Sequence, residues 1–281
     1  MKTITRGRWQ GTSYRDTGTG PAVMLMHGFP ADGTLWNHQV PRLEKNFRLL
    51  IPDLPGSGSS PLTGPLSIED MAEVIGEVLD DAGVARPVVI GHSMGGYAAL
   101  AFAERYPERL AGLGLYHSTA FEDSPEKKEG RLRSIRLMRS YGGPRFLSQT
   151  VQGLFTAAFR GAHPGVLREL VARAGKAPSG ALAYYYEAMR ERPDRTAVLR
   201  GARVPVLFVI GAQDTAAPAS DVLRQVSLPA VSQVCLWDDV AHMSMLETPE
   251  RAAGALESFA KFCEEYPGLC AGRTEPRVSV V

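Results

Sequence analysis

A serine between two glycines is the first feature of this sequence that could do chemistry. The pattern G-x-S-x-G at 91–95 follows a short apolar run at 87–90 and precedes an Ala-rich helical pattern at 98–106. A tight turn between a strand and a helix lifts the serine hydroxyl above the sheet, and glycines avoid backbone clashes in such a turn. The helix then directs its first N–H groups at the reacting carbonyl. We therefore predict that Ser93 is a nucleophile.

A serine hydroxyl reacts only when a base takes its proton, and histidine is the usual base. The chain has six histidines. His242 lies after the last predicted strand (231–237) and ahead of the last predicted helix, so its loop can reach the carboxyl edge of the sheet. His92 neighbours Ser93 and should point away from it, and His163 lies in a helical segment. In this motif the base comes last in chain order, which favours His242.

The base needs a carboxylate that fixes its tautomer and stabilises its protonated form. Asp214 directly follows the predicted strand 204–210, so it also lies at the carboxyl edge. Asp238 and Asp239 are too close in sequence to His242 for a natural approach. Asp123 follows the previous strand, but the two residues directly after that strand offer no acid. We predict Asp214.

An oxyanion requires two N–H donors aimed at one point. Met94 supplies a backbone N–H directly after the nucleophile, and Phe29, in the H-G-F-P loop 27–30, is the predicted second donor. His27 is expected to shape that loop rather than to touch the substrate. Asp53, in a D-L-P-G-S-G turn, is expected to cap its own glycine turn.

The elements that must position these residues alternate between short apolar strands and helical patterns, which is typical of βαβ units and a mostly parallel sheet. The rhythm stops at 117–199, where helical patterns are separated by Gly and Pro, and then resumes. We therefore predict an α/β core formed by 1–116 and 200–266, an inserted helical lid at 117–199, and a C-terminal tail at 267–281. The predicted strands are 22–26, 47–51, 87–90, 110–116, 204–210 and 231–237, and the predicted helices are 68–79, 98–106, 129–141, 166–174, 181–191 and 249–264.

Composition excludes several classes of function. The net charge is +1, which argues against nucleic acid as a partner. No apolar run is long enough to span a bilayer, and the first residues do not resemble a secretion signal, so a cytoplasmic location is expected. The three cysteines are too few for a disulfide framework; Cys263 and Cys270 are close enough in sequence to pair, but free thiols are favoured. No cluster has metal-ligand spacing, so neither a metal nor a cofactor is predicted.

At this point the chain resembles the α/β-hydrolase superfamily. It is most similar to bacterial hydrolases of small molecules, among them pimeloyl-carrier-protein methyl esterases, enol-lactonases, perhydrolases and carbon–carbon bond hydrolases. The resemblance rests on H-G-F-P, D-L-P-G-x-G-x-S, G-H-S-M-G-G, G-x-x-D and the stretch 242–249. It implies a triad of Ser93, Asp214 and His242 with an oxyanion hole at Phe29 and Met94. Relatives that use an aspartate nucleophile, the dehalogenases and epoxide hydrolases, are disfavoured by the serine.

The leading hypothesis is therefore hydrolysis of a small carboxylic ester through an acyl-enzyme. Lactone or carbon–carbon bond hydrolysis on the same triad, and a ligand-binding receptor that retains the triad, stay open as alternatives. The candidate pocket residues are aromatic or apolar side chains of the lid and of the segment after the oxyanion loop: Leu35, Trp36, Phe146, Phe155, Phe159, Tyr184, Tyr185 and Tyr186.

The lid is basic although the chain is nearly neutral. Residues 121–200 hold 15 Lys and Arg against 8 Asp and Glu, which is +7, so the remainder of the chain sums to −6. This asymmetry suggests an acidic partner or an anionic substrate, with an acyl carrier protein as one candidate.

Overall fold

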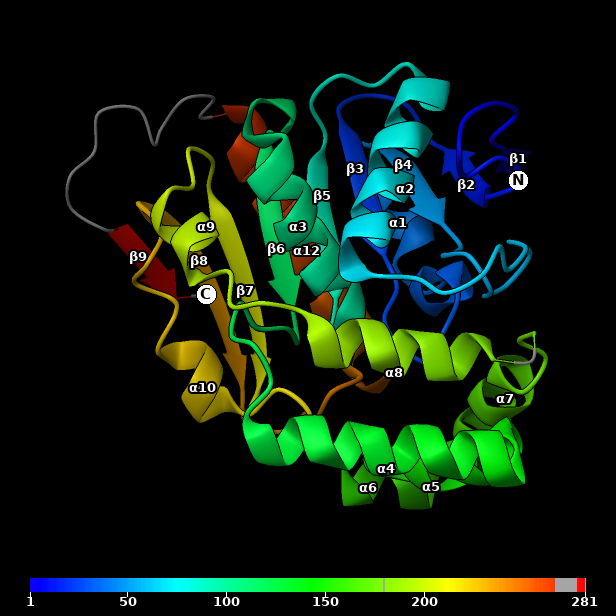
Figure 1. Cartoon of the computed structure of the whole chain (residues 1–281). Coiled ribbons are helices and arrows are strands. Elements are labelled where there is room, and N and C mark those ends of the chain that lie inside the picture. The colour runs from blue at the N-terminus through cyan, green and yellow to red at the C-terminus, as the bar shows by residue number, and fades with distance from the viewer. Residues whose placement is uncertain (179, 266–276, 281) are drawn as a thin grey trace.

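The computed structural model describes residues 1–178, 180–265 and 277–280, and within them the chain forms one nine-stranded sheet in the order β1-β2-β4-β3-β5-β6-β7-β8-β9 (Figure 1). β2 pairs antiparallel with β1 and β4, and the other neighbouring strands are parallel. The strands are β1 (Lys2–Thr3), β2 (Ser13–Thr17), β3 (Ala22–Met26), β4 (Arg48–Pro52), β5 (Val88–His92), β6 (Gly112–Tyr116), β7 (Val206–Gly211), β8 (Val231–Trp237) and β9 (Arg277–Val280). The predicted α/β architecture with a mostly parallel sheet is confirmed.

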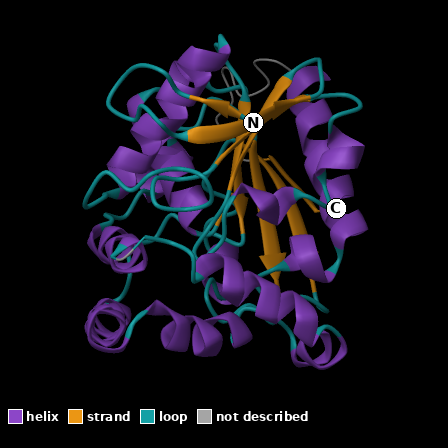
Figure 2. Cartoon of the chain, turned by 90° about the vertical axis from the view of Figure 1, so that its right-hand side faces the viewer, coloured by secondary structure: helices purple, strands orange, loops and turns teal. Residues whose placement is uncertain are grey.

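Helices cover both faces of this sheet, as Figure 2 shows. They are α1 (Val40–Leu43), α2 (Ile68–Ala82), α3 (Met94–Arg105), α4 (Pro125–Tyr141), α5 (Gly143–Gln152), α6 (Ala157–Ala162), α7 (Pro164–Ala174), α8 (Ala181–Glu191), α9 (Thr196–Arg200), α10 (Ala219–Leu223), α11 (Ser244–Glu247) and α12 (Pro249–Glu265). Two short 3₁₀ helices, η1 (Gly33–Trp36) and η2 (Pro107–Arg109), complete the set. Within the described ranges, each helix is too short or too polar to cross a membrane.

Strand residues alternate between two apolar cores because successive side chains of a strand point to opposite faces. In β3, Met24 and Met26 pack in the core that contains α2 and α3, whereas Val23 and Leu25 pack in the core that contains α1 and α12. Both faces of the central strands are therefore buried, which explains their continuous apolar sequence.

Local signals explain where α2 begins and ends. The Ser67 side chain accepts the Asp70 N–H, and the Asp70 carboxylate accepts the Ser67 N–H, which is a capping box. Gly83 ends the helix with φ at +65°, a conformation that glycine adopts without steric cost. This helix covers the sheet face on which α3 also packs.

Within the segment predicted as a lid (117–199, called the lid below), α4 to α8 lie across the carboxyl ends of the parallel strands (Figure 1). Within it α4 packs against α8, and α5 packs against α7. α4 begins at 125, four residues before the predicted start, because the Ser124 side chain caps it. The sequence patterns do not predict α5 and α6. At the end of the same segment, α9 packs against α3 of the core.

Both edges of the sheet contain strands that the sequence patterns do not predict: β1 and β2 at one edge and β9 at the other. Residues 277–280, predicted to belong to a tail, form β9 beside β8. Their alternating valines suit a strand, and the edge of β8 offers free backbone partners. The rest of the predicted tail, including Cys270 and its suggested pairing with Cys263, lies outside the described residues. At the other edge, Asp16 of β2 accepts two hydrogen bonds from Arg48 of β4, at 2.9 and 2.8 Å.

Candidate active site

Ser93 occupies the turn between β5 and α3 with φ at +50° and ψ at −114°. A positive φ is strained for a residue other than glycine and persists only where the surroundings enforce it. Here the Ser93 N–H donates to the Tyr116 carbonyl at 2.9 Å, and the Ser118 hydroxyl donates to the Ser93 carbonyl at 2.8 Å. The turn therefore has the strained form that the sequence pattern predicts, with Ser93 half-buried at the carboxyl edge of the sheet.

Close backbone approaches explain the glycines around Ser93. A Cβ on Gly91 would lie 2.2 Å from the Gly95 carbonyl carbon, and one on Gly95 would lie 2.6 Å from the His27 carbonyl oxygen. A Cβ on Gly28 would lie 2.9 Å from the Ser93 Cβ. The H-G-F-P loop thus passes directly beside the serine, and any side chain at these glycines would push the turn and the loop apart.

His242 and Asp214 meet in a buried hydrogen bond, with His242 Nδ1 2.7 Å from Asp214 Oδ2. The other carboxylate oxygen, Oδ1, accepts the N–H groups of Ala216 and Ala217 at 2.8 and 2.9 Å. Burial alone would raise the pKa of Asp214, but the His242 and His117 rings outweigh burial and hold that pKa far below its ordinary value. The carboxylate is therefore ionised and fixed at neutral pH.

His92 connects this pair to the serine turn. Its Nε2 lies 3.0 Å from the His242 carbonyl oxygen, and the two rings are 4.8 Å apart. Burial lowers the pKa of His92 well below its ordinary value, so the ring is neutral and Nε2 donates. The residue next to Ser93 in sequence thus holds the backbone of His242, and both lie at the same edge of the sheet.

His117 is a member of this site that sequence reasoning missed. It is fully buried directly after β6, and its Nδ1 lies 3.3 Å from Asp214 Oδ2, a contact that falls short of a well-aligned hydrogen bond. Its Nε2 lies 2.7 Å from the Ser244 Oγ, which in turn contacts the Tyr116 hydroxyl at 2.8 Å. The sequence signal for His117 is its place directly after a predicted strand, where the side chain of either an acid or a base reaches the carboxyl edge.

The donor atoms of His117, Asp214 and His242 lie within 4.8 Å of one another, which raises the question of a metal ion. A nitrogen and an oxygen that share a metal each lie about 2.0–2.2 Å from it. Here the 2.7 Å contact between His242 and Asp214 is the length of a charge-assisted hydrogen bond. Hydrogen bonding therefore accounts for the cluster.

The predicted oxyanion donors lie on the two segments that flank Ser93. The Met94 N–H is the first of α3, and the first N–H groups of a helix have no partner within it. Phe29 follows β3 in the loop that contacts Ser93 through Gly28. His27 shapes that loop, because its Nε2 accepts the Leu54 N–H at 2.9 Å.

Asp53 lies at the start of the turn that follows β4, and its carboxylate binds backbone N–H groups, in the capping role expected of it. Its Oδ1 accepts the Gly33 N–H and its Oδ2 accepts the Ser59 N–H, both at 2.8 Å. These bonds fasten the turn after β4 to η1.

The lid is tied to the His242 loop by two direct contacts. The His242 N–H donates to the Leu154 carbonyl at 3.0 Å. The Glu247 carboxylate accepts the Ala241 N–H at 2.9 Å and the Thr156 N–H at 2.7 Å. Residues 154–156 therefore support the position of His242.

The acids that compete with Asp214 in the sequence have other partners. Asp123 is buried within the lid, where it contacts Arg131 and lies 2.9 Å from the Arg192 Nη2. Asp239 pairs with Arg251 at 2.5 Å, and Asp238 is exposed. Asp214 is the carboxylate that the fold brings to His242.

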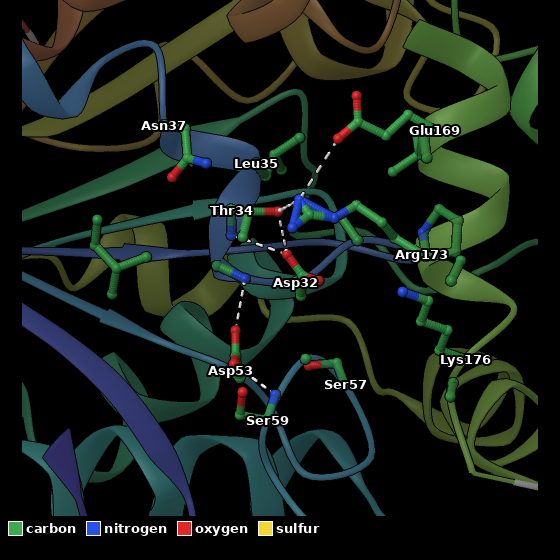
Figure 3. Close-up of a pocket in the computed structure, with 18 of the residues that line it drawn as sticks. Asp32, Thr34, Leu35, Asn37, Asp53, Ser57, Ser59, Glu169, Arg173 and Lys176 are labelled. Carbon is green, nitrogen blue, oxygen red and sulfur yellow. Dashed lines mark hydrogen bonds and ion pairs between the residues drawn. The ribbon is translucent and has the colours of Figure 1, made fainter. Parts of the chain in front are cut away.

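A cavity of about 550 Å³ opens between the lid and the loop that follows β3 (Figure 3). Of the candidate pocket residues, Tyr185 and Leu35 line it. The other six do not line it. Trp36 packs on Tyr116 with ring centres 5.4 Å apart, and Phe155 stacks on Phe159 at 5.2 Å. The rings of Phe146 and Tyr186 lie 6.4 and 4.8 Å from that of Phe29, and Tyr184 is likewise absent from the cavity lining.

Comparison with known proteins identifies the family. A family model described as the alpha/beta hydrolase fold matches residues 21–249. The chain is 31% identical over 263 residues to a pimeloyl-[acyl-carrier protein] methyl ester esterase of Methylococcus capsulatus, covering 89% of this chain and 98% of that protein. The corresponding esterase of Sodalis glossinidius is 30% identical over 267 residues, covering 88% and 97%.

Solved structures agree with this result. A thermophilic esterase from Thermogutta terrifontis, solved with malate bound, superposes with a TM-score of 0.87 at 33% identity, covering 94% of this chain and 98% of that one. The enol-lactonase from Burkholderia xenovorans LB400 superposes with a TM-score of 0.82 at 26% identity, covering 89% and 96%. By sequence, by sheet order and by the turn that carries its serine, this chain belongs to the α/β-hydrolase family.

Proposed function

We propose that this protein is a serine hydrolase that cleaves a small carboxylic ester through an acyl-enzyme. The observation that carries the proposal is the buried 2.7 Å bond between His242 and Asp214, at the sheet edge where Ser93 occupies its strained turn. Because Asp214 is ionised and accepts from Nδ1, the proton of the neutral His242 ring is held on Nδ1. Nε2 is then the nitrogen left to accept a proton.

The reaction proceeds in two halves. The Ser93 oxygen attacks the ester carbonyl while His242 takes the hydroxyl proton, and the resulting oxyanion is stabilised by the N–H groups of Met94 and Phe29. The C–O bond to the alcohol then breaks, and His242 returns the proton to the departing alkoxide. A water molecule, deprotonated by His242, attacks the acyl-enzyme and releases the acid and the free serine.

The relatives support a reaction at an ester or lactone carbonyl, since they include esterases and an enol-lactonase. Lactone hydrolysis needs the same groups and differs only in that the alcohol stays attached to the acid. Carbon–carbon bond hydrolysis on the same triad and ligand binding without turnover are two competing functions. A fluorophosphonate probe that labels Ser93, followed by p-nitrophenyl acetate turnover by the wild type and Ser93→Ala, separates these classes.

We expect labelling and turnover by the wild type, and a loss of several orders of magnitude in kcat for Ser93→Ala. Labelling without turnover on a panel of esters and lactones would favour ligand binding. Turnover that survives in Ser93→Ala would refute the serine mechanism. Met94→Ala is a poor control because the proposed donor is a backbone group; Ser220→Ala, which replaces an exposed serine of α10, is a matched one.

We further propose that the lid receives an acidic carrier protein that presents the ester. Arg133, Arg136, Leu137 and Tyr141 share one face of α4, because they are spaced i, i+3, i+4 and i+8. All four side chains are exposed, with Leu137 50% and Tyr141 69% accessible. Cations around exposed apolar side chains suit an acidic protein surface, and two relatives act on esters held by a carrier protein.

This partner is tested with matched methyl esters, one free and one linked to an acyl carrier protein. We expect a higher kcat/KM for the linked ester, a steep fall with added salt, and a further fall in Arg133→Glu/Arg136→Glu. Arg203→Glu is the control, since Arg203 is exposed at the opposite end of the strands. Equal rates on both esters without a salt effect would rule the carrier out.

A further inference from the structure

The cavity of about 550 Å³ has one wall from the core and one from the lid. The core wall comprises residues 30–35 and the turn 56–59, and the lid wall comprises α7 and the start of α8. Figure 3 shows Arg173 and Lys176 reaching from the lid side toward Asp32 and Thr34 on the core side. The cavity is therefore bounded by charged side chains although it lies beside an apolar core.

The cations of this cavity are poorly neutralised. Arg173 donates to the neutral Thr34 hydroxyl at 2.8 Å and lies 3.9 Å from Glu169, whose side chain is 72% exposed. Arg15 donates to the neutral Asn37 side chain at 2.8 Å. The Lys176 N–H donates to the Arg173 carbonyl at 3.0 Å, but the Lys176 ammonium makes no hydrogen bond or ion pair with any residue in the described part of the chain. Three positive side chains thus line the cavity together with three carboxylates, Asp32, Asp53 and Glu169, of which Glu169 alone lies within 4.0 Å of one of these cations among the described residues.

The two aspartates that line the cavity are already occupied. Asp32 accepts the Thr34 N–H at 2.9 Å and also the Thr34 hydroxyl, so it caps η1. Asp53 is buried and accepts the Gly33 and Ser59 N–H groups. Neutral donors of the fold itself therefore bind these carboxylates and leave their negative charges in place, while the guanidinium and ammonium groups retain unused N–H donors.

The cavity also has an apolar floor, part of which comes from residues close in sequence to the candidate catalytic residues. Pro30 directly follows the proposed oxyanion donor Phe29, and Leu246 comes from the helix that follows His242. Tyr185 lines the cavity and its hydroxyl donates to the Pro55 carbonyl at 2.8 Å. Other apolar lining residues are Leu35, Ile51, Leu170 and Leu182. Ser93 and His242 are not among the described residues that line the cavity, so the cavity is a neighbouring space that adjoins the segments of the catalytic candidates only through Pro30 and Leu246.

We propose that this cavity binds an oxyanion at the far end of the acyl chain, held by Arg173 and Lys176, so that the preferred substrates are esters of acids with a second, anionic group. The proposal rests on the proposed esterase function. A carboxylate and a phosphate share the required chemistry, because both accept bidentate or paired hydrogen bonds from arginine and lysine.

The kinetic test compares kcat/KM for an anionic and a neutral ester of similar length. Monomethyl adipate is compared with methyl hexanoate, and a methyl ester that ends in a phosphate forms a third arm that distinguishes the two anions. The wild type should prefer at least one anionic ester by about tenfold or more, and added salt should reduce the preference. In Arg173→Gln/Lys176→Gln the ratio of anionic to neutral kcat/KM should fall at least about tenfold, through KM.

Two variants separate charge from structure. Thr34→Val removes the hydrogen bond between lid and core but keeps both cations, so it should retain most of the preference. Arg168→Gln removes an exposed cation of α7 outside the cavity and should change neither rates nor ratio. An equal preference for neutral and anionic esters, or a ratio that survives the double substitution, would overturn the proposal.

Binding distinguishes a failure of this proposal from a failure of the proposed function. Calorimetry of Ser93→Ala with adipate should show binding that weakens with salt and is lost in Arg173→Gln/Lys176→Gln. Binding without ester turnover by the wild type would refute the esterase function alone. Turnover of neutral esters, without adipate binding and without a preference for either anionic ester, would refute the oxyanion site alone.

Discussion

Replacing Asp214 by asparagine tests how the carboxylate sets the histidine tautomer. In the wild type Oδ1 accepts two backbone N–H groups, and Oδ2 accepts His242 Nδ1. An asparagine side chain of the same shape has one oxygen and one NH₂ group. The backbone donors of Ala216 and Ala217 require the oxygen on their side, so the NH₂ group faces His242. The ring must then accept at Nδ1 and carry its proton on Nε2, where it cannot take the Ser93 proton.

The magnitude follows from the cost of the other orientation. Turning the amide so that its oxygen faces His242 leaves two buried N–H groups opposite an NH₂ group, at about 1–3 kcal/mol each. The productive tautomer therefore costs about 2–6 kcal/mol, which corresponds to a loss of about 30-fold to about 20,000-fold in rate. The loss should fall on kcat, because the tautomer affects the chemical step and not the binding of the ester.

The assay measures p-nitrophenyl acetate turnover. Each rate is divided by the concentration of natively folded protein, which is obtained from the unfolding transition. Asp238→Asn is the matched control. Asp238 is a candidate partner of His242 only by its position in the sequence, and because its side chain is exposed, its replacement should leave kcat unchanged. Asp214→Asn that keeps a third or more of the wild-type kcat would show that this carboxylate does not orient the base. Loss confined to KM would contradict the tautomer argument as well.

Three further predictions concern the contacts of His117, Asp123 and Asp16. His117→Asn, in which asparagine tolerates the φ of +48°, should lower kcat about 5- to 30-fold because Asp214 loses its second imidazole contact; unchanged kcat would make His117 a packing residue only. Asp123→Ala should destabilise the protein by about 3–5 kcal/mol in urea unfolding, because it leaves its arginine partners buried without a counter-charge. The arginine beside Asp16 lowers its pKa to about 2, so Asp16 stabilises the fold fully above about pH 5 and less as the pH falls toward 2. Asp16→Asn should therefore cost about 1–2 kcal/mol at pH 7 and little at pH 2, and an equal cost at both would refute the assignment.

The parallel core was predictable because each strand has a clear local pattern. A short apolar run that ends in a turn residue must be buried on both faces, and each of the six predicted strands lies within about two residues of an observed one. The catalytic candidates follow from the same rule, since side chains after parallel strands meet at one edge. The pattern therefore placed Ser93, Asp214 and His242 at the same end of the sheet.

Other features depend on contacts between distant segments, which no local pattern records. β9 pairs with the open edge of β8, and the two alternating valines of an exposed four-residue strand are too short a pattern to predict that pairing. His117 gains its contact only after β6 and β7 pair and bring Asp214 beside it. The aromatic character of a side chain does not predict that it lines the cavity, because most of the candidate rings pack against core or lid side chains. What lines the cavity is set by how the lid rests on the core.

The contacts of residues 154–156 with the His242 loop also limit how this lid can be exchanged or moved. The Leu154 carbonyl holds the His242 backbone, and the Thr156 N–H holds Glu247. A graft that replaces the whole lid would remove these supports and misplace the base, whatever pocket it introduced. Chimeras should therefore keep 154–156 and exchange α7 and α8 instead. By the same logic, an opening motion that preserves activity must swing the α7 side outward and leave this segment as its fixed point.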